Sequence, residues 1–476
     1  MSPTISIDPV TRIEGHGKVF LDFAPDGQLE SAGLIVNELR GFERILVGIE
    51  ADRLPLITAR ICGVCPSAHH LAASKALDMA AGVQPPPAAA LLRELLYMGH
   101  YIHSHALSLF VLQGPDLVMG LDADPAVRNI VGVVAAAPEV AKKALRCRTL
   151  GQKINEMVGG RGVHPVTSVA GGITFRLDTD RRRLLAAWFD EAAKLTQELA
   201  GVARTLVLKQ VTANPALVEQ WTLPTWSLGT TQNGRLNLYD GNLRAIDDTG
   251  AIRAEFPASD YDKYIVESSL PWSYMKPVRL ACDGEEHVYR VGPLPRLNVA
   301  DAIGTPVADR ELERLRADFG RPAQATVLQA YAWAIELVHA AERGLEILGD
   351  RRIDGDTRTP VKFRGGRGTA HVEAPRGSLF HDYEIDDQGI VRAANLVVAT
   401  QQNYDAINRS IEQAARTHVV GKGDRALLNA VEFAIRCYDP CLSCATHAVG
   451  RMPLEIMIRQ NGEVVRRFGR NADGEY

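Results

Sequence analysis

The chain carries two Cys-x-x-Cys units whose four thiols could bind a single metal centre. The first unit holds Cys62 and Cys65, and the second holds Cys441 and Cys444. Thiolates are soft ligands, and the two thiols of such a unit can be directed at the same metal. The remaining cysteines stand outside these units, and we interpret them as small structural residues: Cys147, Cys282 and Cys437.

The spacing between the two units leaves the kind of metal open. Four cysteines in two such units are typical of a tetrahedral structural zinc site. Zinc modules, however, usually place their pairs roughly 15 to 20 residues apart, whereas these pairs stand near opposite ends of a 476-residue chain. A metal site that joins the two pairs would not stabilise one short segment, as a zinc module does. Zinc, an iron–sulfur cluster and a catalytic metal are all compatible with the ligand type.

Polar residues beside both units favour a reactive centre over a closed one. His69 follows Cys65 closely, and Asp439 stands just before Cys441. Such side chains orient metal-bound thiolates, tune their basicity and move protons. A structural site with four protein ligands does not require them.

Composition excludes several other classes of protein. Hydrophobic residues make up 46% of the chain and charged residues 23%, as in ordinary globular proteins. With a formal net charge of −4 and no basic cluster interleaved with aromatics, nucleic acid is a poor partner. The N-terminal residues lack the features of a signal peptide, and no apolar run is long enough to cross a bilayer. We therefore expect a cytoplasmic protein without a membrane span, in which seven cysteines indicate metal ligation rather than disulfides.

Long helices are expected to position the two units. Three consecutive prolines at 85–87 set the entry to a helix over 88–112. The other predicted helices span 139–157, 181–209, 323–348, 405–418 and 425–438, the last ending just before Pro440.

Strands are expected at the periphery. The chain begins with predicted strands at 4–8 and 18–23, a turn at 25–27 and an apolar run through Val36. The segment 234–256 alternates, 378–400 indicates a hairpin around 386–389, and 454–470 indicates a hairpin around Asn461-Gly462. No internal repeat, low-complexity linker or clear domain boundary is evident.

Several motifs, in order along the chain, resemble those of nickel-iron hydrogenase large subunits. They are DPVTRIEGH at 8–16, RGFE at 40–43, the two Cys units with their flanks, and EAPRG at 373–377. Each is weak alone, but a chance match of all of them in the expected places is very improbable. Within that family, WSYMK at 272–276 and DPCLSCATH at 439–447 most resemble the bidirectional NAD-coupled enzymes.

The resemblance implies the fold. It is an α+β fold, mainly helical, in which a central bundle of long helices is surrounded by small peripheral sheets and the two Cys units meet at the centre. We expect one domain over 1–447, with a mainly β start over 1–45 and a helical core with β excursions over 60–440.

The resemblance also implies a ligand set. Cys62 and Cys441 would be terminal ligands of nickel, and Cys65 and Cys444 would bridge nickel to an iron that carries carbon monoxide and cyanide. Metal binding would keep all four as thiolates. The diatomic ligands come only with the family.

Family precedent assigns the remaining site residues. Hydrogen would be cleaved heterolytically, with Cys441 as the base and Glu14 as the next proton acceptor, a role that needs a carboxyl whose pKa is raised by partial burial. Without the family, a salt bridge between Glu14 and Arg12 would be the better interpretation.

Arg376 would lie over the iron, where its guanidinium suits a cyanide nitrogen. Thr400 would donate to the other cyanide, with His69 and Asp439 beside the centre. Glu43, the Leu396 carbonyl and His447 would bind a magnesium ion together with water.

The family further implies partners and processing. A protease would remove 448–476 after His447 once insertion factors have delivered iron and nickel. The chain has no further Cys cluster for an electron relay and no Gly-rich dinucleotide fingerprint. A small subunit would supply an iron–sulfur cluster, and diaphorase subunits would carry further clusters, FMN and NAD.

Three alternatives remain open at this point. The chain could be a relative that kept the fold and lost the metals, although such a relative lacks the Cys pairs. It could be a non-catalytic scaffold stapled by zinc. The hydrogen chemistry could also serve another acceptor, such as NADP, ferredoxin or a flavin carrier.

Overall fold

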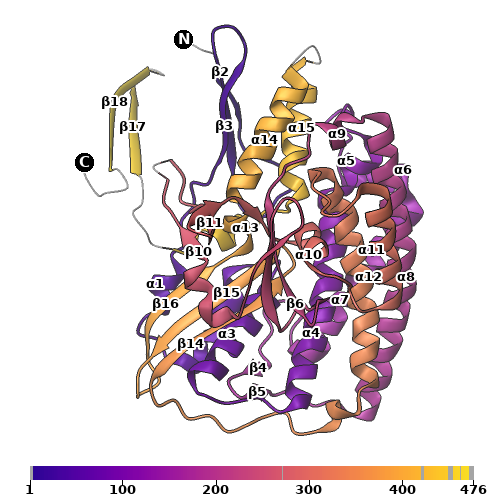
Figure 1. Ribbon diagram of the computed structural model, residues 1–476, viewed down its shortest axis with the longest axis vertical. Coiled ribbons are helices and arrows are strands. Elements are labelled where there is room, and N and C mark those ends of the chain that lie inside the picture. The colour runs from indigo at the N-terminus through magenta and orange to yellow at the C-terminus, as the bar shows by residue number, and fades with distance from the viewer. Residues whose placement is uncertain (1–3, 271, 420–422, 449–453, 461–462, 471–476) are drawn as a thin grey trace.

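Four long helices stand side by side along one flank of the molecule, and small sheets lie on the opposite flank (Figure 1). The computed structural model describes residues 4–270, 272–419, 423–448, 454–460 and 463–470. The four helices are α4 (Pro87–Leu107), α7 (Pro138–Gly159), α8 (Thr179–Ala213) and α12 (Gln329–Gly349). They confirm the predicted bundle and, with the small sheets, the predicted fold class.

Further helices surround this bundle. The longer ones are α3 (Pro66–Ala80), α11 (Pro306–Phe319), α14 (Tyr404–Val419) and α15 (Gly423–Cys437). The shorter ones are α1 (Phe42–Leu46), α2 (Leu54–Thr58), α5 (Gly114–Met119), α6 (Ile130–Ala136), α9 (Ala216–Glu219), α10 (Pro293–Val299), α13 (Ala399–Gln402) and α16 (Leu442–Ala445). No helix within the described ranges is both long and apolar enough to cross a membrane.

The sheets are mostly antiparallel. One joins β1 (Thr4–Ile7), β2 (Lys18–Phe23) and β3 (Leu29–Ile35), and another joins β14 (Gly366–Ala374), β15 (Gly377–Ile385) and β16 (Val391–Val397). A larger sheet has the order β13-β6-β8-β9, with β7 paired to β6: β6 (Trp226–Gln232), β7 (Arg235–Leu236), β8 (Asn242–Ile246), β9 (Ile252–Phe256) and β13 (Tyr289–Arg290). Smaller sheets join β10 (Ile265–Glu267), β11 (Val278–Cys282) and β12 (Glu285–His287), then β4 (Ser168–Val169) with β5 (Gly172–Ile173), and β17 (Leu454–Gln460) with β18 (Glu463–Arg470).

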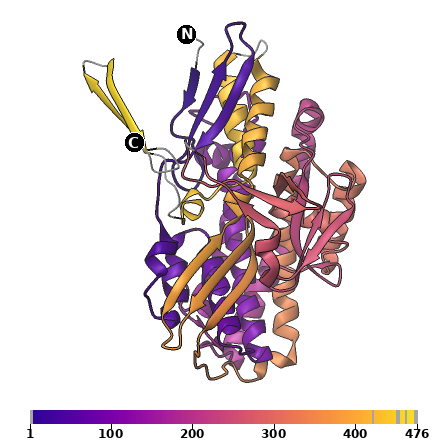
Figure 2. The same ribbon diagram turned by 60° about the vertical axis from the view of Figure 1, so that its left-hand side comes forward.

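The sheet of β14 to β16 lies against α3, which follows the first Cys unit. Strands β14 and β15 are buried along most of their length, because the helix covers one face of them (Figure 2). Gly368 allows the closest approach, since a Cβ atom there would lie 2.0 Å from the carbonyl oxygen of Ala76. At the other end of this pair, Cys65, just before α3, and Ala374, at the end of β14, line the same cavity.

Most predicted elements are confirmed, with differences at their ends. The helix predicted over 88–112 ends as an α-helix at Leu107 and continues as one π-helical turn, Ser108–Leu112. The helix predicted from 323 begins only at Gln329. The sequence analysis missed α3 and α11, although each begins with a proline at its first position. The strands of the last predicted hairpin are present, whereas its turn at Asn461-Gly462 lies outside the described residues.

One buried carboxylate ties the N-terminal loop to the helix that precedes the second Cys unit. Asp116, in α5, bonds Arg12 at 2.8 and 2.9 Å, Arg128 at 3.0 Å and Arg436 at 2.9 and 3.1 Å. Although burial opposes its charge, the three arginines hold the pKa of Asp116 below its ordinary value. Arg12 therefore pairs with Asp116, which replaces the alternative of a salt bridge to Glu14.

Asp116→Asn tests this junction. The change keeps the shape of the side chain but leaves three arginines, two of them buried, with one fewer counter-charge, so we expect unfolding to cost about 3–5 kcal/mol less. Asp190→Asn is the control, because Asp190 pairs with Lys194 on the exposed face of α8 and should contribute less than about 0.5 kcal/mol. Chemical denaturation measures both variants. Equal losses would contradict the assignment.

Candidate metal centre

The four thiols of the two Cys units converge on one buried point. The distance between the sulfur atoms is 3.2 Å for Cys62 and Cys441, 3.3 Å for Cys65 and Cys444, and 2.9 Å for Cys441 and Cys444. All four sulfurs lie within 4.8 Å of one another. Cys65 is the residue just before α3 and Cys441 the residue just before α16, so each unit lies at the start of a helix.

Electrostatics make this cluster unfavourable without a cation. Burial raises the pKa of Cys441 and Cys444 well above the ordinary value of a thiol, and for Cys441 the neighbouring sulfurs add to this. Burial also opposes ionisation of Cys62, but hydrogen bonds from the other thiols lower its pKa well below the ordinary value. The backbone N–H groups of Val64 and Cys65 also donate to its sulfur, at 3.2 and 3.3 Å. All four can be thiolates together only when a metal ion compensates them.

Glu14 contacts the sulfur of Cys441. Its Oε2 atom lies 3.0 Å from that Sγ and accepts the backbone N–H of Ser443 at 3.0 Å. The carbonyl of Glu14 also accepts the N–H of Leu442 at 3.0 Å. The N-terminal motif and the second Cys unit are thus bonded to each other through both backbone and side chain.

Arg376 approaches the cluster from the turn between β14 and β15. Its Nε donates to the carbonyl of Asp439 at 2.6 Å, and one terminal nitrogen lies 2.6 Å from the Asp439 carboxylate. Burial raises the pKa of Asp439 to about 6, even though Arg376 acts in the opposite direction. The other terminal nitrogen, Nη1, is buried without a hydrogen-bond partner among the described residues.

A small cavity opens beside three of the thiols. It is lined by Arg376, Thr400 and His69 on its polar side, and its apolar wall consists of Ala374, Leu379, Val398 and Ala399. The Thr400 hydroxyl accepts the N–H of Cys441 at 2.9 Å, which leaves its hydrogen available to a second partner. The cavity therefore offers an apolar space with two donors, suited to small ligands that carry an acceptor atom.

His69 continues into a chain of side chains that the sequence analysis missed. Its Nε2 lies 3.4 Å from the sulfur of Cys444, and its Nδ1 lies 3.1 Å from Nε2 of His381. The other nitrogen of His381 lies 2.6 Å from the hydroxyl of Tyr383. Burial lowers the pKa of His69 to about 4, so its ring is neutral at pH 7. For His381 and Tyr383, the only signal in the sequence is that they stand two residues apart on a predicted strand and therefore share one of its faces.

Glu43 and His447 form a second polar group next to the cluster. The His447 Nδ1 atom lies 2.9 Å from Glu43 Oε1, and its Nε2 atom lies 2.5 Å from the side-chain oxygen of Gln401. Leu396 contributes its backbone N–H, which donates to Glu43 at 2.8 Å. Burial opposes the charge of Glu43, but the contact with His447 outweighs it and lowers the pKa of Glu43. Gln401 was not foreseen from the sequence.

Comparisons with known proteins point to one family. A family model described as nickel-dependent hydrogenase matches residues 40–130 and 255–447, and one described as HoxL-like matches residues 4–39. The chain is 42% identical over 413 residues to one chain of the vhu F420-non-reducing hydrogenase of Methanococcus voltae, covering 86% of this chain and 98% of the relative.

A second relative and a solved structure have NAD in their names. The chain is 37% identical over 477 residues to the beta subunit of the NAD-reducing hydrogenase HoxS of Cupriavidus necator, covering 96% of this chain and 97% of the relative. A crystal structure of NAD+-reducing [NiFe]-hydrogenase in the H2-reduced state matches with a TM-score of 0.88 and 38% identity, over 94% of this chain and 100% of the other.

Cys62→Ser tests the cluster as a nickel site. A serine hydroxyl is a harder ligand than a thiolate and stays protonated at neutral pH, so we expect nickel to be lost. Cys282→Ser is the control, since Cys282 ends β11 outside the cluster, and it should retain nickel at the parent level. Metal analysis of the purified, desalted proteins measures both, and full nickel content in Cys62→Ser would exclude Cys62 as a ligand.

Proposed function

The chain belongs to the nickel-dependent hydrogenase family, and we propose that it is the catalytic large subunit of a nickel-iron hydrogenase that couples reversible H2 oxidation to NAD(H). The observation that carries this proposal is the convergence of four buried thiols with a carboxylate in contact with one of them. A zinc staple would need the thiols but neither Glu14 nor the cavity lined by Arg376 and Thr400.

The four cysteines are the ligands for the metals in this proposal. Cys62 and Cys441 would bind nickel alone, and Cys65 and Cys444 would bridge it to iron. When bound, the nickel–iron centre supplies the polarisation of H2 and accepts its electrons. Iron would lie toward the cavity, because both bridging cysteines, Cys65 and Cys444, line it, whereas only one of the two terminal nickel ligands, Cys441, does.

Glu14 and Cys441 would carry the proton. The sulfur of Cys441 takes the proton as H2 is cleaved and passes it to Glu14 Oε2 across a hydrogen bond that is already 3.0 Å long. The N–H of Ser443 holds that oxygen in place. Little movement is then needed for the transfer.

Arg376 and Thr400 would receive the cyanide ligands of iron. The partnerless Nη1 of Arg376 and the free hydrogen of the Thr400 hydroxyl are two donors directed to the cavity. Apolar side chains such as Leu379 and Val398 would keep water away from the carbon monoxide ligand. His69 and Asp439 would orient a bridging thiolate and Arg376 respectively.

Magnesium would bind between Glu43 and His447. A carboxylate and an imidazole in direct contact offer two ligand atoms, and the carbonyl of Leu396 would add a third, with water completing the shell. Magnesium would then replace the hydrogen bond between the two side chains.

The segment after His447 would be removed during maturation. The nickel-dependent hydrogenase model ends its match at residue 447, and strands β17 and β18 project away from the body of the molecule (Figures 1 and 2). A cut between His447 and Ala448 would leave the site residues in the mature chain, with 1–447 as its single domain.

A small subunit with an iron–sulfur cluster would take the electrons, and diaphorase subunits with FMN would pass them to NAD. The NAD-reducing relative and solved structure support this acceptor. The F420-non-reducing relative, at 42% identity, favours a second candidate in which the same hydrogen chemistry serves another carrier.

Metal analysis and infrared spectroscopy of the complex purified with its partners test the function. We expect nickel and iron in equal amounts, bands of carbon monoxide and cyanide, and NAD+ reduction that depends on H2. Zinc without those bands would contradict the hydrogenase proposal. The bands together with H2 oxidation that uses another carrier and not NAD+ would contradict only the acceptor.

The intact mass of the active chain tests the processing. We expect a C-terminus at His447 in nickel-loaded protein and an uncut chain in protein made without nickel. A nickel-loaded, active chain that still contains Tyr476 would refute the cut.

A further inference from the structure

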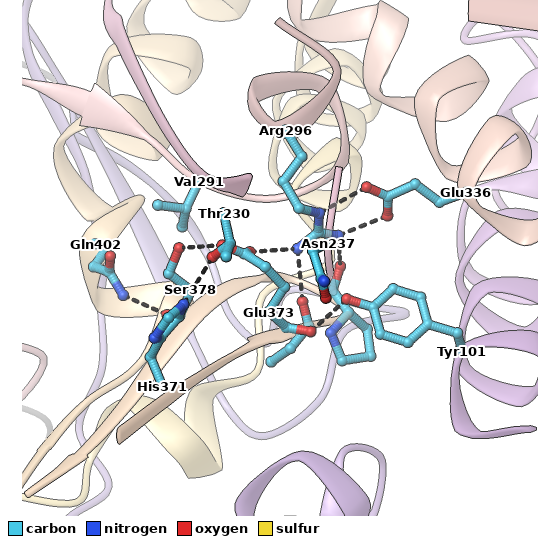
Figure 3. Close-up of polar contacts among 12 residues, drawn as sticks. Tyr101, Thr230, Asn237, Val291, Arg296, Glu336, His371, Glu373, Ser378 and Gln402 are labelled. Carbon is cyan, nitrogen blue, oxygen red and sulfur yellow. Dashed lines mark hydrogen bonds and ion pairs between the residues drawn. The ribbon is translucent and has the colours of Figure 1, made fainter. Parts of the chain in front are cut away.

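A buried polar network stands behind the turn that carries Arg376. The turn joins β14 and β15 in a tight hairpin in which Ala374 pairs with Gly377. Its tip packs against the start of α10, where a Cβ atom on Gly292 would lie 2.9 Å from the carbonyl oxygen of Arg376. Arg296 extends from the same short helix toward the turn (Figure 3).

Arg296 uses all its donors in this network. Nε and Nη2 each donate to the Glu336 carboxylate at 2.6 Å. Nη1 donates to the Glu373 carboxylate at 3.0 Å and to the Ala374 carbonyl at 2.8 Å, and Nη2 donates to the Pro375 carbonyl at 3.0 Å. A guanidinium has five N–H groups, and each has an acceptor here. One side chain thus holds three successive residues before Arg376.

Other side chains complete the support. The hydroxyls of Tyr97 and Tyr101 both donate to the carbonyl of Glu373. Thr230 and Ser378 donate to its carboxylate at 2.7 and 2.8 Å. Figure 3 shows Arg296 between the carboxylates of Glu336 and Glu373. The backbone of the turn is therefore fixed by side chains from α4, α10, β6 and β15.

We propose that Arg296 is a positioning residue for Arg376, with Glu336 as the group that orients it. Arg376 is held at its head by Asp439, but the place of its Cα atom depends on the turn that Arg296 holds. The inference rests on the proposed function, since it concerns the donor that Arg376 offers to the cyanide ligand.

The test uses the assembled enzyme and the variant Arg296→Lys. Lysine keeps the charge but has at most three donors and no fork, so the turn shifts. We expect nickel and iron at the parent level, displaced cyanide bands in the infrared spectrum, and kcat lower on the order of 10- to 100-fold with little change in KM for H2. Glu336→Gln, which keeps the shape and weakens the anchor, should displace the same bands by less.

Arg93→Lys is the matched control. Arg93 is also buried, pairs with the carboxylate of Asp78 at 2.6 Å and donates to the carbonyls of Val169 and Gly172. It should lower thermal stability while leaving the cyanide bands in place. If Arg296→Lys and Glu336→Gln behave like Arg93→Lys, with stability lowered and bands and kcat unchanged, Arg296 is only structural.

Failure of the two ideas can be told apart. Absence of cyanide bands from the parent enzyme would sink the proposed function. Bands in the parent that stay fixed in both variants would sink only the inference. If neither variant assembles, Tyr97→Phe, which removes one donor to the Glu373 carbonyl, must displace the bands for the proposal to stand.

Discussion

Mutual repulsion among four buried thiolates is the constraint on which this structure depends. Their sulfurs lie within 4.8 Å of one another in a region that excludes water, where each negative charge is costly and disfavours the next. Arg376 is the nearest buried cation described at the cavity, but Asp439 already compensates it. The chain thus leaves the thiolate charge for the metals, and metal binding becomes part of the free energy of folding.

Two buried networks of opposite charge support segments that carry residues of this centre. On the side of Glu14, one carboxylate, Asp116, gathers three arginines. On the side of Arg376, one guanidinium, Arg296, gathers two carboxylates. Each network joins segments that are far apart in the chain. Asp116 binds Arg12, two residues before Glu14, and Arg296 binds the turn that carries Arg376. Placement of the site is therefore decided by ion pairs that contact neither metal nor substrate.

The sequence predicted the site better than it predicted what supports it. The Cys units, Glu14 and Arg376 stand in motifs, so their types and spacing carried the information. His381, Gln401 and Arg296 stand in none, and their partners come from distant elements. Glu336 left one usable signal, because it is the only acid in the apolar first part of α12, residues 329–341, and such a charge needs a buried partner.

Secondary structure shows a similar division. Long helices with a clear apolar periodicity were predicted within a few residues of their ends, since burial of one face dictates them. The helix α3 was missed because most of its side chains are buried, so its sequence shows little apolar periodicity. Its position is set by the sheet of β14 to β16, a contact that local sequence does not contain.

The bond between Glu14 and the second Cys unit has a consequence for how the protein is made. A ribosome delivers residues in order, at about 5–20 per second, so the N-terminal loop leaves it long before residues 441–444 exist. During that interval the loop lacks the partners that complete it: the backbone of Leu442 and Ser443, and the carboxylate of Glu432, which accepts from Thr11. Closure of the metal site therefore has to await the C-terminal segment, and the loop around Glu14 cannot make these contacts before that segment has been synthesised.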